Sequence, residues 1–385
     1  MLLERRVLMA IQVSKKKKRI LMLTITEDCN LRCNYCYEEH KRPGSMDLSI
    51  AKSAIERHFF TSNTYDELQI EFFGGEPFIF FELIQEICNW VWSQAWPKPY
   101  LFFATTNGTL IHGGIQDWIY ENRERFILAL SLDGLPEMHN HNRSNSYDRI
   151  DCQFFARTWP NQPIKMTVSS HTLPRLAQGV EFLHNLGFKI DGNLAYGIDW
   201  SDKKNITLVA DQLEKLVAFY MKHPELEPAS FLSMAIKRAG NEPFPIRKWC
   251  GVGTDMVAVG TDGQEYPCHM FQPMSIGNKS KTNAEISFTN VAALQDEKCV
   301  NCMLLPICPT CYGSNYLLTG NPSIRDQALC SLTKVRALAC AKLHALRIQS
   351  TPITQINNEK EAADQLRLIR AIKAIQASFD LQSLY

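Results

Sequence analysis

This sequence of 385 residues lacks several features that would narrow its function at once. Lysine and arginine total 41 against 40 acidic residues, so no excess charge indicates a nucleic-acid or membrane partner. No apolar run reaches the ~18 residues of a membrane helix, and there is no internal repeat. The start, "MLLERRVLMA", carries early charges and no small-residue cleavage site, so we expect no signal peptide. We therefore expect a cytoplasmic protein.

The sequence is rich in cysteine. There are 13 cysteines, while 45% of all residues are hydrophobic, as in a globular protein with a real core. Disulfides are rare in the reducing cytoplasm, and clustered cysteines in that setting indicate metal binding. Cys88, Cys152 and Cys340 stand apart from the clusters among apolar residues, and we expect them to be buried and inert.

An alternation of β-prone and helical stretches follows residue 19. The expected strands are Ile20–Thr26, Leu68–Phe73, Tyr100–Thr106, Phe126–Leu132, Ile164–Ser169 and Lys189–Leu194. The expected helices are 47–61, 81–95, 113–122, 148–158, 174–186 and 205–222. Six βα units in series predict an α/β fold with a parallel sheet and outer helices, a partial (β/α)6 TIM-like barrel. Ligands gather at the carboxyl ends of strands in such barrels.

The composition divides the chain into five expected parts. These are a basic segment at 1–19, a barrel at 20–225, a linker at 226–248, a cysteine-rich domain at 249–335 and a helical tail at 336–385. We interpret "KKKKR", Lys15 to Arg19, as a solvated approach to the first strand; binding an acidic peptide segment is the alternative. The cysteine-rich part has little periodicity, so we expect metal rather than a large core to hold it together.

The first cysteine group, Cys29, Cys33 and Cys36, has C-x3-C-x2-C spacing just past the first expected strand. Tetrahedral zinc wants four ligands, which Glu38, Glu39 or His40 would have to complete. A [4Fe–4S] cluster usually takes four cysteines, so three leave one iron open for a ligand. The spacing favours the open cluster, with zinc and coincidence as alternatives.

These residues resemble the radical S-adenosylmethionine (SAM) enzymes. In that family the same triad follows the first strand of a partial barrel and holds a [4Fe–4S] cluster, whose open iron binds SAM. The resemblance implies one-electron cleavage of SAM to a 5′-deoxyadenosyl radical that abstracts hydrogen from a substrate. It also implies a flavodoxin- or ferredoxin-type electron donor.

Motifs at the other strand ends extend the resemblance. They are "EFFGGEP", "TTNGTL", "SLDG" and "TVSS", in the family's order. In "GGEP" the glycines would admit the SAM backbone closely, and Glu76 would take its ammonium group. Tyr35 would pack on the adenine. The implied SAM-binding residues are Tyr35, Gly74, Gly75, Glu76, Pro77, Asn107, Ser131, Asp133, Arg143 and Ser169.

Seven later cysteines resemble the SPASM domain, a C-terminal extension of peptide-modifying radical SAM enzymes. "GQEYPC" and "CVNCMLLPIC" match its pattern, whereas "CPTC" has two intervening residues in place of three. The resemblance implies two auxiliary [4Fe–4S] clusters. One would be held by Cys299, Cys302, Cys308 and Cys330, and the other by Cys250, Cys268 and Cys311.

The second auxiliary set is one cysteine short. Asp255 and His269 are the non-cysteine candidates for the missing ligand, and an open iron that binds substrate is the alternative. Sulfatase-maturing relatives carry a catalytic aspartate immediately after the counterpart of Cys268. Here that position is His269, which counts against sulfatase maturation, although histidine titrates near neutral pH. His269 and Asp255 are thus the candidate catalytic side chains.

The resemblance therefore predicts a maturase of a ribosomally made precursor peptide. An intramolecular crosslink (cyclophane, C–C, ether or thioether) is the leading hypothesis, because an auxiliary cluster would accept the electron that bond formation releases. Oxidation of a protein Cys or Ser side chain, as in sulfatase maturation, and peptide epimerisation are enzymatic alternatives. A zinc-stapled binding protein is the alternative of another class. Only 19 residues precede the first strand, so we expect a separate leader-binding protein or docking of the leader on the barrel.

Overall fold

The computed structural model describes residues 17–60, 64–240, 248–282, 284–350 and 358–379. Most of the basic segment expected at 1–19 therefore lies outside the described residues. Across the described ranges, no helix combines the length and the apolar character that crossing a membrane requires.

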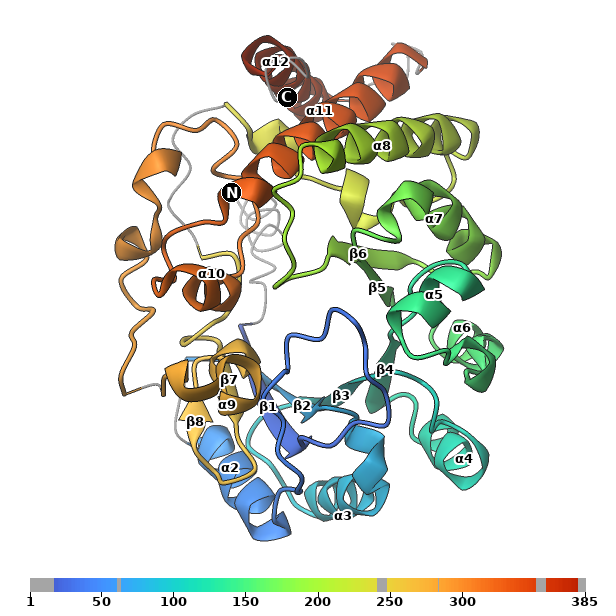
Figure 1. Cartoon of the computed structure of the whole chain (residues 1–385). Coiled ribbons are helices and arrows are strands. Elements are labelled where there is room, and N and C mark those ends of the chain that lie inside the picture. Colours follow the sequence, from blue (N-terminus) through green and yellow to red (C-terminus); the bar gives the residue numbers. More distant parts are fainter. Residues whose placement is uncertain (1–16, 61–63, 241–247, 283, 351–357, 380–385) are drawn as a thin grey trace, which may run out of the picture.

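Parallel strands form a curved sheet that does not close (Figure 1). Four of them pair in the order β4-β3-β2-β1, namely β1 (Lys18–Thr26), β2 (Glu67–Gly74), β3 (Tyr100–Thr106) and β4 (Phe126–Leu130). A second parallel pair consists of β5 (Ile164–Val168) and β6 (Ile190–Leu194). A parallel bridge between Ser131 and Lys165 joins the two groups. The expected partial (β/α)6 barrel is confirmed.

A helix follows each of these strands on the outer side. The helices are α2 (Leu48–Phe60), α3 (Phe81–Trp92), α4 (Gly113–Glu121), α5 (Pro136–Asn142), α6 (Cys152–Thr158), α7 (Leu176–Asn185) and α8 (Lys204–Lys222). In α7 the spacing of Leu176, Val180 and Leu183 puts all three in the core. Such one-sided burial is what keeps a helix on a barrel wall.

Two details of this part differ from the prediction. The helix expected over 148–158 begins later, at Cys152, after a 3-10 turn. Helix α5 was not expected at all. Its sequence "PEMHNHN" has no apolar stripe, and its buried residues include His139 and Asn142, whose polar side chains are hydrogen-bonded.

The cysteine-rich region joins the same sheet. Strand β7 (Met256–Val259) runs parallel to β1, and β8 (Glu265–Tyr266) pairs antiparallel with β7. The register sets Ile20 opposite Met256. The side chains of Thr24 and Gln272, both buried, are hydrogen-bonded at 2.9–3.0 Å. Two short helices, α9 (Pro273–Ile276) and α10 (Tyr312–Thr319), complete this region.

The C-terminal helices lie against the barrel helix α8. Helix α11 (Gln327–Ser350) packs along α8, and α12 (Glu359–Ser378) packs on α11 (Figure 1). Helix α11 crosses the boundary predicted at 335. The 3-10 turns are η1 (Pro77–Phe80), η2 (Tyr147–Arg149), η3 (Leu173–Arg175), η4 (Ser230–Leu232), η5 (Ile236–Arg238), η6 (His269–Phe271), η7 (Gly277–Lys279), η8 (Ala292–Leu294) and η9 (Glu297–Cys299). Turns η4 and η5 fall within the expected linker, and Phe231 and Ile236 there are buried.

The ends of β1 and β2 approach each other closely at two glycines. Gly74 has a φ of 132°, and a Cβ there would overlap the carbonyl oxygen of Thr26. A Cβ on Gly75 would overlap the carbonyl oxygen of Asp28. The N–H of Gly75 donates to the Thr26 oxygen at 3.1 Å. These glycines are needed for the packing of two backbone segments.

Replacing Gly75 by alanine should therefore destabilise the protein. The added methyl group meets backbone rather than a movable side chain, so we expect a loss of about 1–3 kcal/mol in the free energy of unfolding. Urea denaturation followed by circular dichroism measures it. Gly114→Ala is the matched control, because a Cβ at Gly114 meets open space, and its midpoint should be unchanged or raised. Equal midpoints for the two variants would contradict the close approach.

Candidate functional site

The first cysteine group lies on the loop that follows β1. Cys29, Cys33 and Cys36 line one cavity of about 500 Å³. The loop is fixed to the end of α5, because the N–H of Asn34 donates to the Asn142 carbonyl at 3.0 Å. The structure thus brings all three predicted ligands to the carboxyl end of β1.

A lysine lies among these thiols. Lys41 Nζ donates to Cys36 Sγ at 3.3 Å and pairs with Glu38 at 3.2 Å. Burial raises the pKa of the Cys29 thiol to about 11, and the charge of Lys41 acts in the opposite direction. The same charge opposes the raised pKa of Cys33. The positive charge of Lys41 favours the thiolate forms of these cysteines. Its position five residues after Cys36 matches no motif that would have identified it from the sequence.

Glu76 is buried between the ends of β2 and β3. Its carboxylate accepts from the Asn107 N–H at 2.7 Å, from Thr106 Oγ1 at 2.8 Å and from the Phe78 N–H at 3.3 Å. Burial raises the pKa of Glu76 to about 7, and these hydrogen bonds partly offset that effect. Pro77 follows as the first residue of η1. The carboxylate therefore accepts hydrogen bonds from the protein's own backbone and from the Thr106 side chain.

Asp133, just after β4, is the centre of a buried network. Its Oδ2 accepts from the Tyr35 hydroxyl and, at 3.0 Å, from Arg143 Nε. The same oxygen accepts from Asn142 Nδ2 at 3.1 Å. Its Oδ1 accepts from the Thr167 N–H at 2.9 Å. Asp133 is fully buried, so its main effect is to hold Tyr35 and Arg143, two of the other predicted SAM-binding residues.

The remaining strand-end residues are buried at the same edge of the sheet. Ser169 Oγ donates to Asn142 Oδ1 at 2.9 Å, and Asn107 Nδ2 donates to Asn30 Oδ1 at 2.9 Å. Ser131 bridges to β5 through its backbone. These side chains thus form a polar layer over the carboxyl ends of the strands.

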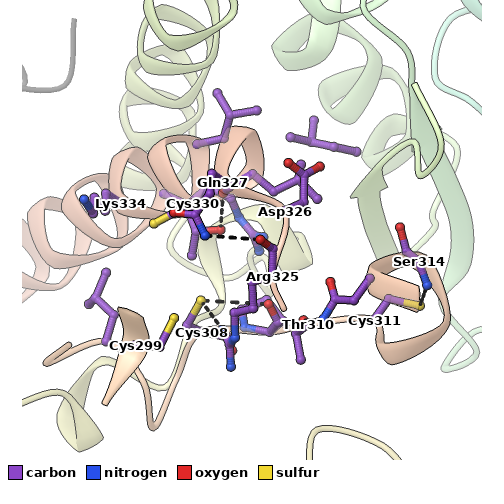
Figure 2. A pocket seen from close by; sticks show the side chains of 18 of the residues that line it. Cys299, Cys308, Thr310, Cys311, Ser314, Arg325, Asp326, Gln327, Cys330 and Lys334 are labelled. Atoms are coloured by element: carbon purple, nitrogen blue, oxygen red, sulfur yellow. Dashed lines mark hydrogen bonds between the residues drawn. The ribbon is translucent and has the colours of Figure 1, made fainter. Parts of the chain in front are cut away.

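Four of the later cysteines lie around a second cavity, whose wall Cys311 also reaches. Cys299, Cys302, Cys308 and Cys330 all line it, and each of the other three contributes to the electrostatic environment of Cys308. Burial raises the pKa of Cys308 to about 11, and the charge of Arg325 is the largest opposing influence. Figure 2 shows Arg325 beside Cys308, with Cys299 and Cys330 nearby. Asn193 and Leu194 of the last barrel strand also line this cavity, as does Tyr196 just after that strand.

Cys250, Cys268 and Cys311 form a separate group. Cys250 and Cys311 both contribute to the electrostatic environment of Cys268, where burial raises the thiol pKa well above its usual value. The N–H of Ser314 donates to Cys311 Sγ at 3.4 Å, away from the other labelled cysteines in Figure 2. Tyr196 lies near Cys250 and Cys311 of this group, and near Arg336. The sequence patterns singled out neither Tyr196 nor Arg336.

The thiols of each group lie near one another but do not converge on the position of a single metal ion. Among the residues that the structure describes, no three Cys, His, Asp or Glu side chains are placed to hold a single metal ion. In a [4Fe–4S] cluster each thiolate binds a different iron, so thiols spread around a cavity fit such a cluster. The three groups contain the donors that the sequence predicted for three clusters.

The two candidate catalytic residues occupy different surroundings. The His269 ring packs against Phe73 at 4.7 Å and Tyr37 at 5.7 Å between centroids, and its Nδ1 is buried without a hydrogen-bond partner. Burial lowers the pKa of His269 to about 4, so the ring is neutral near pH 7. Asp255 is exposed just before β7, next to Gly251, and lines a cavity with Arg19 and His58. His269 thus faces the barrel strands, whereas Asp255 lies beside the loop after Cys250.

Comparisons with known proteins match these features. A family profile described as a 4Fe-4S single cluster domain matches residues 18–145. A cysteine-type anaerobic sulfatase-maturating enzyme of Clostridium novyi is 23% identical over 76% of this chain and 87% of that protein. The antilisterial bacteriocin subtilosin biosynthesis protein AlbA of Bacillus subtilis is 25% identical over 66% of this chain and 56% of that protein.

The fold has solved counterparts as well. A structure of native anSMEcpe with bound AdoMet and Cp18Cys peptide has a TM-score of 0.63 and 19% identity, covering 86% of this chain and 98% of that one. This chain contains the cysteine triad, the motifs at the strand ends and the later cysteine groups. In its sequence relatives and its barrel, the chain is similar to sulfatase-maturating and bacteriocin biosynthesis proteins, and its motifs resemble those of radical SAM enzymes with a C-terminal SPASM domain.

Proposed function

We propose that this enzyme modifies a ribosomally made precursor peptide by forming an intramolecular crosslink. The observation that carries the proposal is that the seven later cysteines fall into a group of four and a group of three by their mutual electrostatic influence. The group of four and Cys311 line a cavity that β6 also borders. An enzyme that only generates a radical needs one cluster. Two further sites beside the barrel suit a reaction in which the substrate also gives up an electron.

The residues at the strand ends fit the family's cofactors. Cys29, Cys33 and Cys36 would hold the [4Fe–4S] cluster, and Tyr35, Glu76 and Arg143 are the side chains that we propose for SAM. When bound, these groups supply a 5′-deoxyadenosyl radical, which takes a hydrogen atom from an unactivated carbon. The protein's part is to orient substrate and exclude water. The buried Asp133 network fixes Tyr35 and Arg143 before any ligand arrives.

We propose His269 as the proton acceptor of the reaction. Closing a bond between two substrate atoms releases a proton and an electron after the first hydrogen atom has left. The buried Nδ1 of His269 has no hydrogen-bond partner and so offers a position for that proton. Asp255 is then the candidate ligand that completes the site of Cys250, Cys268 and Cys311.

Protein side-chain oxidation is the second candidate function. The matched sulfatase-maturating enzyme covers more of this chain than AlbA does, 76% against 66%. Replacement of the family's aspartate by His269 favours the crosslink instead. For partners we propose the precursor peptide, a separate leader-binding protein and a flavodoxin- or ferredoxin-type donor, in the cytoplasm.

Co-expression with each short peptide found to be encoded near this gene tests the function. We expect the isolated peptide to lose two hydrogens, and its tandem mass spectrum to lack fragments within the bridged ring. Oxidised serine also loses two hydrogens, but the resulting aldehyde reacts with a hydrazide, whereas a crosslink does not. An unchanged mass would point to epimerisation and would overturn the crosslink.

Substituting His269 by alanine separates radical formation from proton removal. We expect 5′-deoxyadenosine still to form, while crosslinked peptide forms more slowly by a factor on the order of 100. Chromatography of both products measures the two rates. His223→Ala, which removes an exposed histidine at the end of α8, should change neither. Full crosslinking by His269→Ala would refute the assigned role.

A further inference from the structure

Arg325 makes direct contact with one of the auxiliary cysteine groups. Its Nη1 donates to Cys308 Sγ at 2.9 Å and to the Cys308 carbonyl oxygen at 3.1 Å (Figure 2). Its charge also acts on Cys299, which belongs to the same group. The guanidinium therefore contacts Cys308 and acts on Cys299, in the wall of the cavity that Cys302 and Cys330 also line.

The position of Arg325 is fixed from a second direction. Its backbone N–H donates to Asp296 Oδ2 at 2.8 Å. The other oxygen of Asp296 accepts from the Lys298 N–H at 2.9 Å and so caps the turn that ends at Cys299. Asp296 is buried. One carboxylate thus ties the arginine to the segment that carries the first cysteine of the group.

The thiols of the other auxiliary group receive different donors. Backbone N–H groups reach Cys250 from Val252, and Cys311 from Ser314. Cys268 receives backbone N–H groups as well. These donors are neutral, whereas the donor at Cys308 carries a full positive charge. A charge-assisted hydrogen bond is roughly twice as strong as a neutral one.

We propose that Arg325 raises the reduction potential of the cluster held by Cys299, Cys302, Cys308 and Cys330, and that it leaves the other two clusters unaffected. This inference rests on the proposed function for the presence of that cluster. Reduction adds one negative charge, and both the N–H···S bond and the positive charge stabilise the reduced form. Hydrogen bonds to sulfur and net charge are established determinants of such potentials. Arg325 would therefore make this cluster a stronger electron acceptor than it would be without the arginine, and so better able to take the electron that leaves the substrate.

Redox titration followed by electron paramagnetic resonance tests the proposal without any peptide. The protein is the full chain with its clusters reconstituted. We expect Arg325→Gln to make reduction of one cluster at least tenfold less favourable, a shift of about 59 mV to lower potential for one electron. The signals of the other two clusters should keep their potentials. Unchanged potentials for all three clusters, with iron content retained, would overturn the proposal.

Two further variants serve as a control and as a replacement in the redox titration. Lys334→Met removes a positive charge from the wall of the same cavity, where Lys334 lies over the Phe379 ring, and should leave all three potentials in place. If Arg325→Gln loses iron, Arg325→Met is read instead, because methionine also removes both the charge and the N–H donors. A lower potential in Arg325→Met supports the proposal, and an unchanged one overturns it. Wild-type protein without auxiliary iron would instead refute the proposed function.

Discussion

The structure depends on the pairing of β1 with parallel strands on both edges. β2 lies along one edge and β7, from the cysteine-rich region, along the other. Because the carboxyl ends of parallel strands meet at one edge of a sheet, this pairing brings the loop of Cys29, Cys33 and Cys36 beside the turn that carries Glu76. The Thr24–Gln272 hydrogen bonds then fix the segment of His269 against the same strand.

Burial of polar groups determines what the individual side chains do. Asp133 and Glu76, which the sequence suggested as ligand contacts, are largely committed to other protein atoms. A buried carboxylate is costly unless it is paired, and these two are paired with the donors that shape the site. In the SAM binding that we propose, the effect of these two carboxylates on the ligand would pass through Tyr35, Arg143 and the Asn107 turn. His269 differs, because its buried Nδ1 has no partner.

Much of the barrel fold and of the first cysteine site was predictable from local sequence patterns. The six βα units follow from alternation of strand and helix periods, and the cysteine spacing identifies the first loop. The pairing of β7 with β1 left no local signal, since it joins Ile20 to Met256. Helix α5 escaped prediction because its buried residues are largely polar. Lys41 and Arg325 were missed because a lone cation near cysteines carries no motif; only the fold shows its contacts with sulfur.

The central claim is that three thiol groups hold three [4Fe–4S] clusters and that only the first cleaves SAM. Its most direct test is anaerobic iron and sulfide analysis, combined with a SAM cleavage assay, of the wild type and the Cys29→Ala/Cys33→Ala/Cys36→Ala variant. We predict about twelve irons per wild-type chain and about eight in the variant, which should form no 5′-deoxyadenosine. Zinc in place of iron, or SAM cleavage by the variant, would contradict the account.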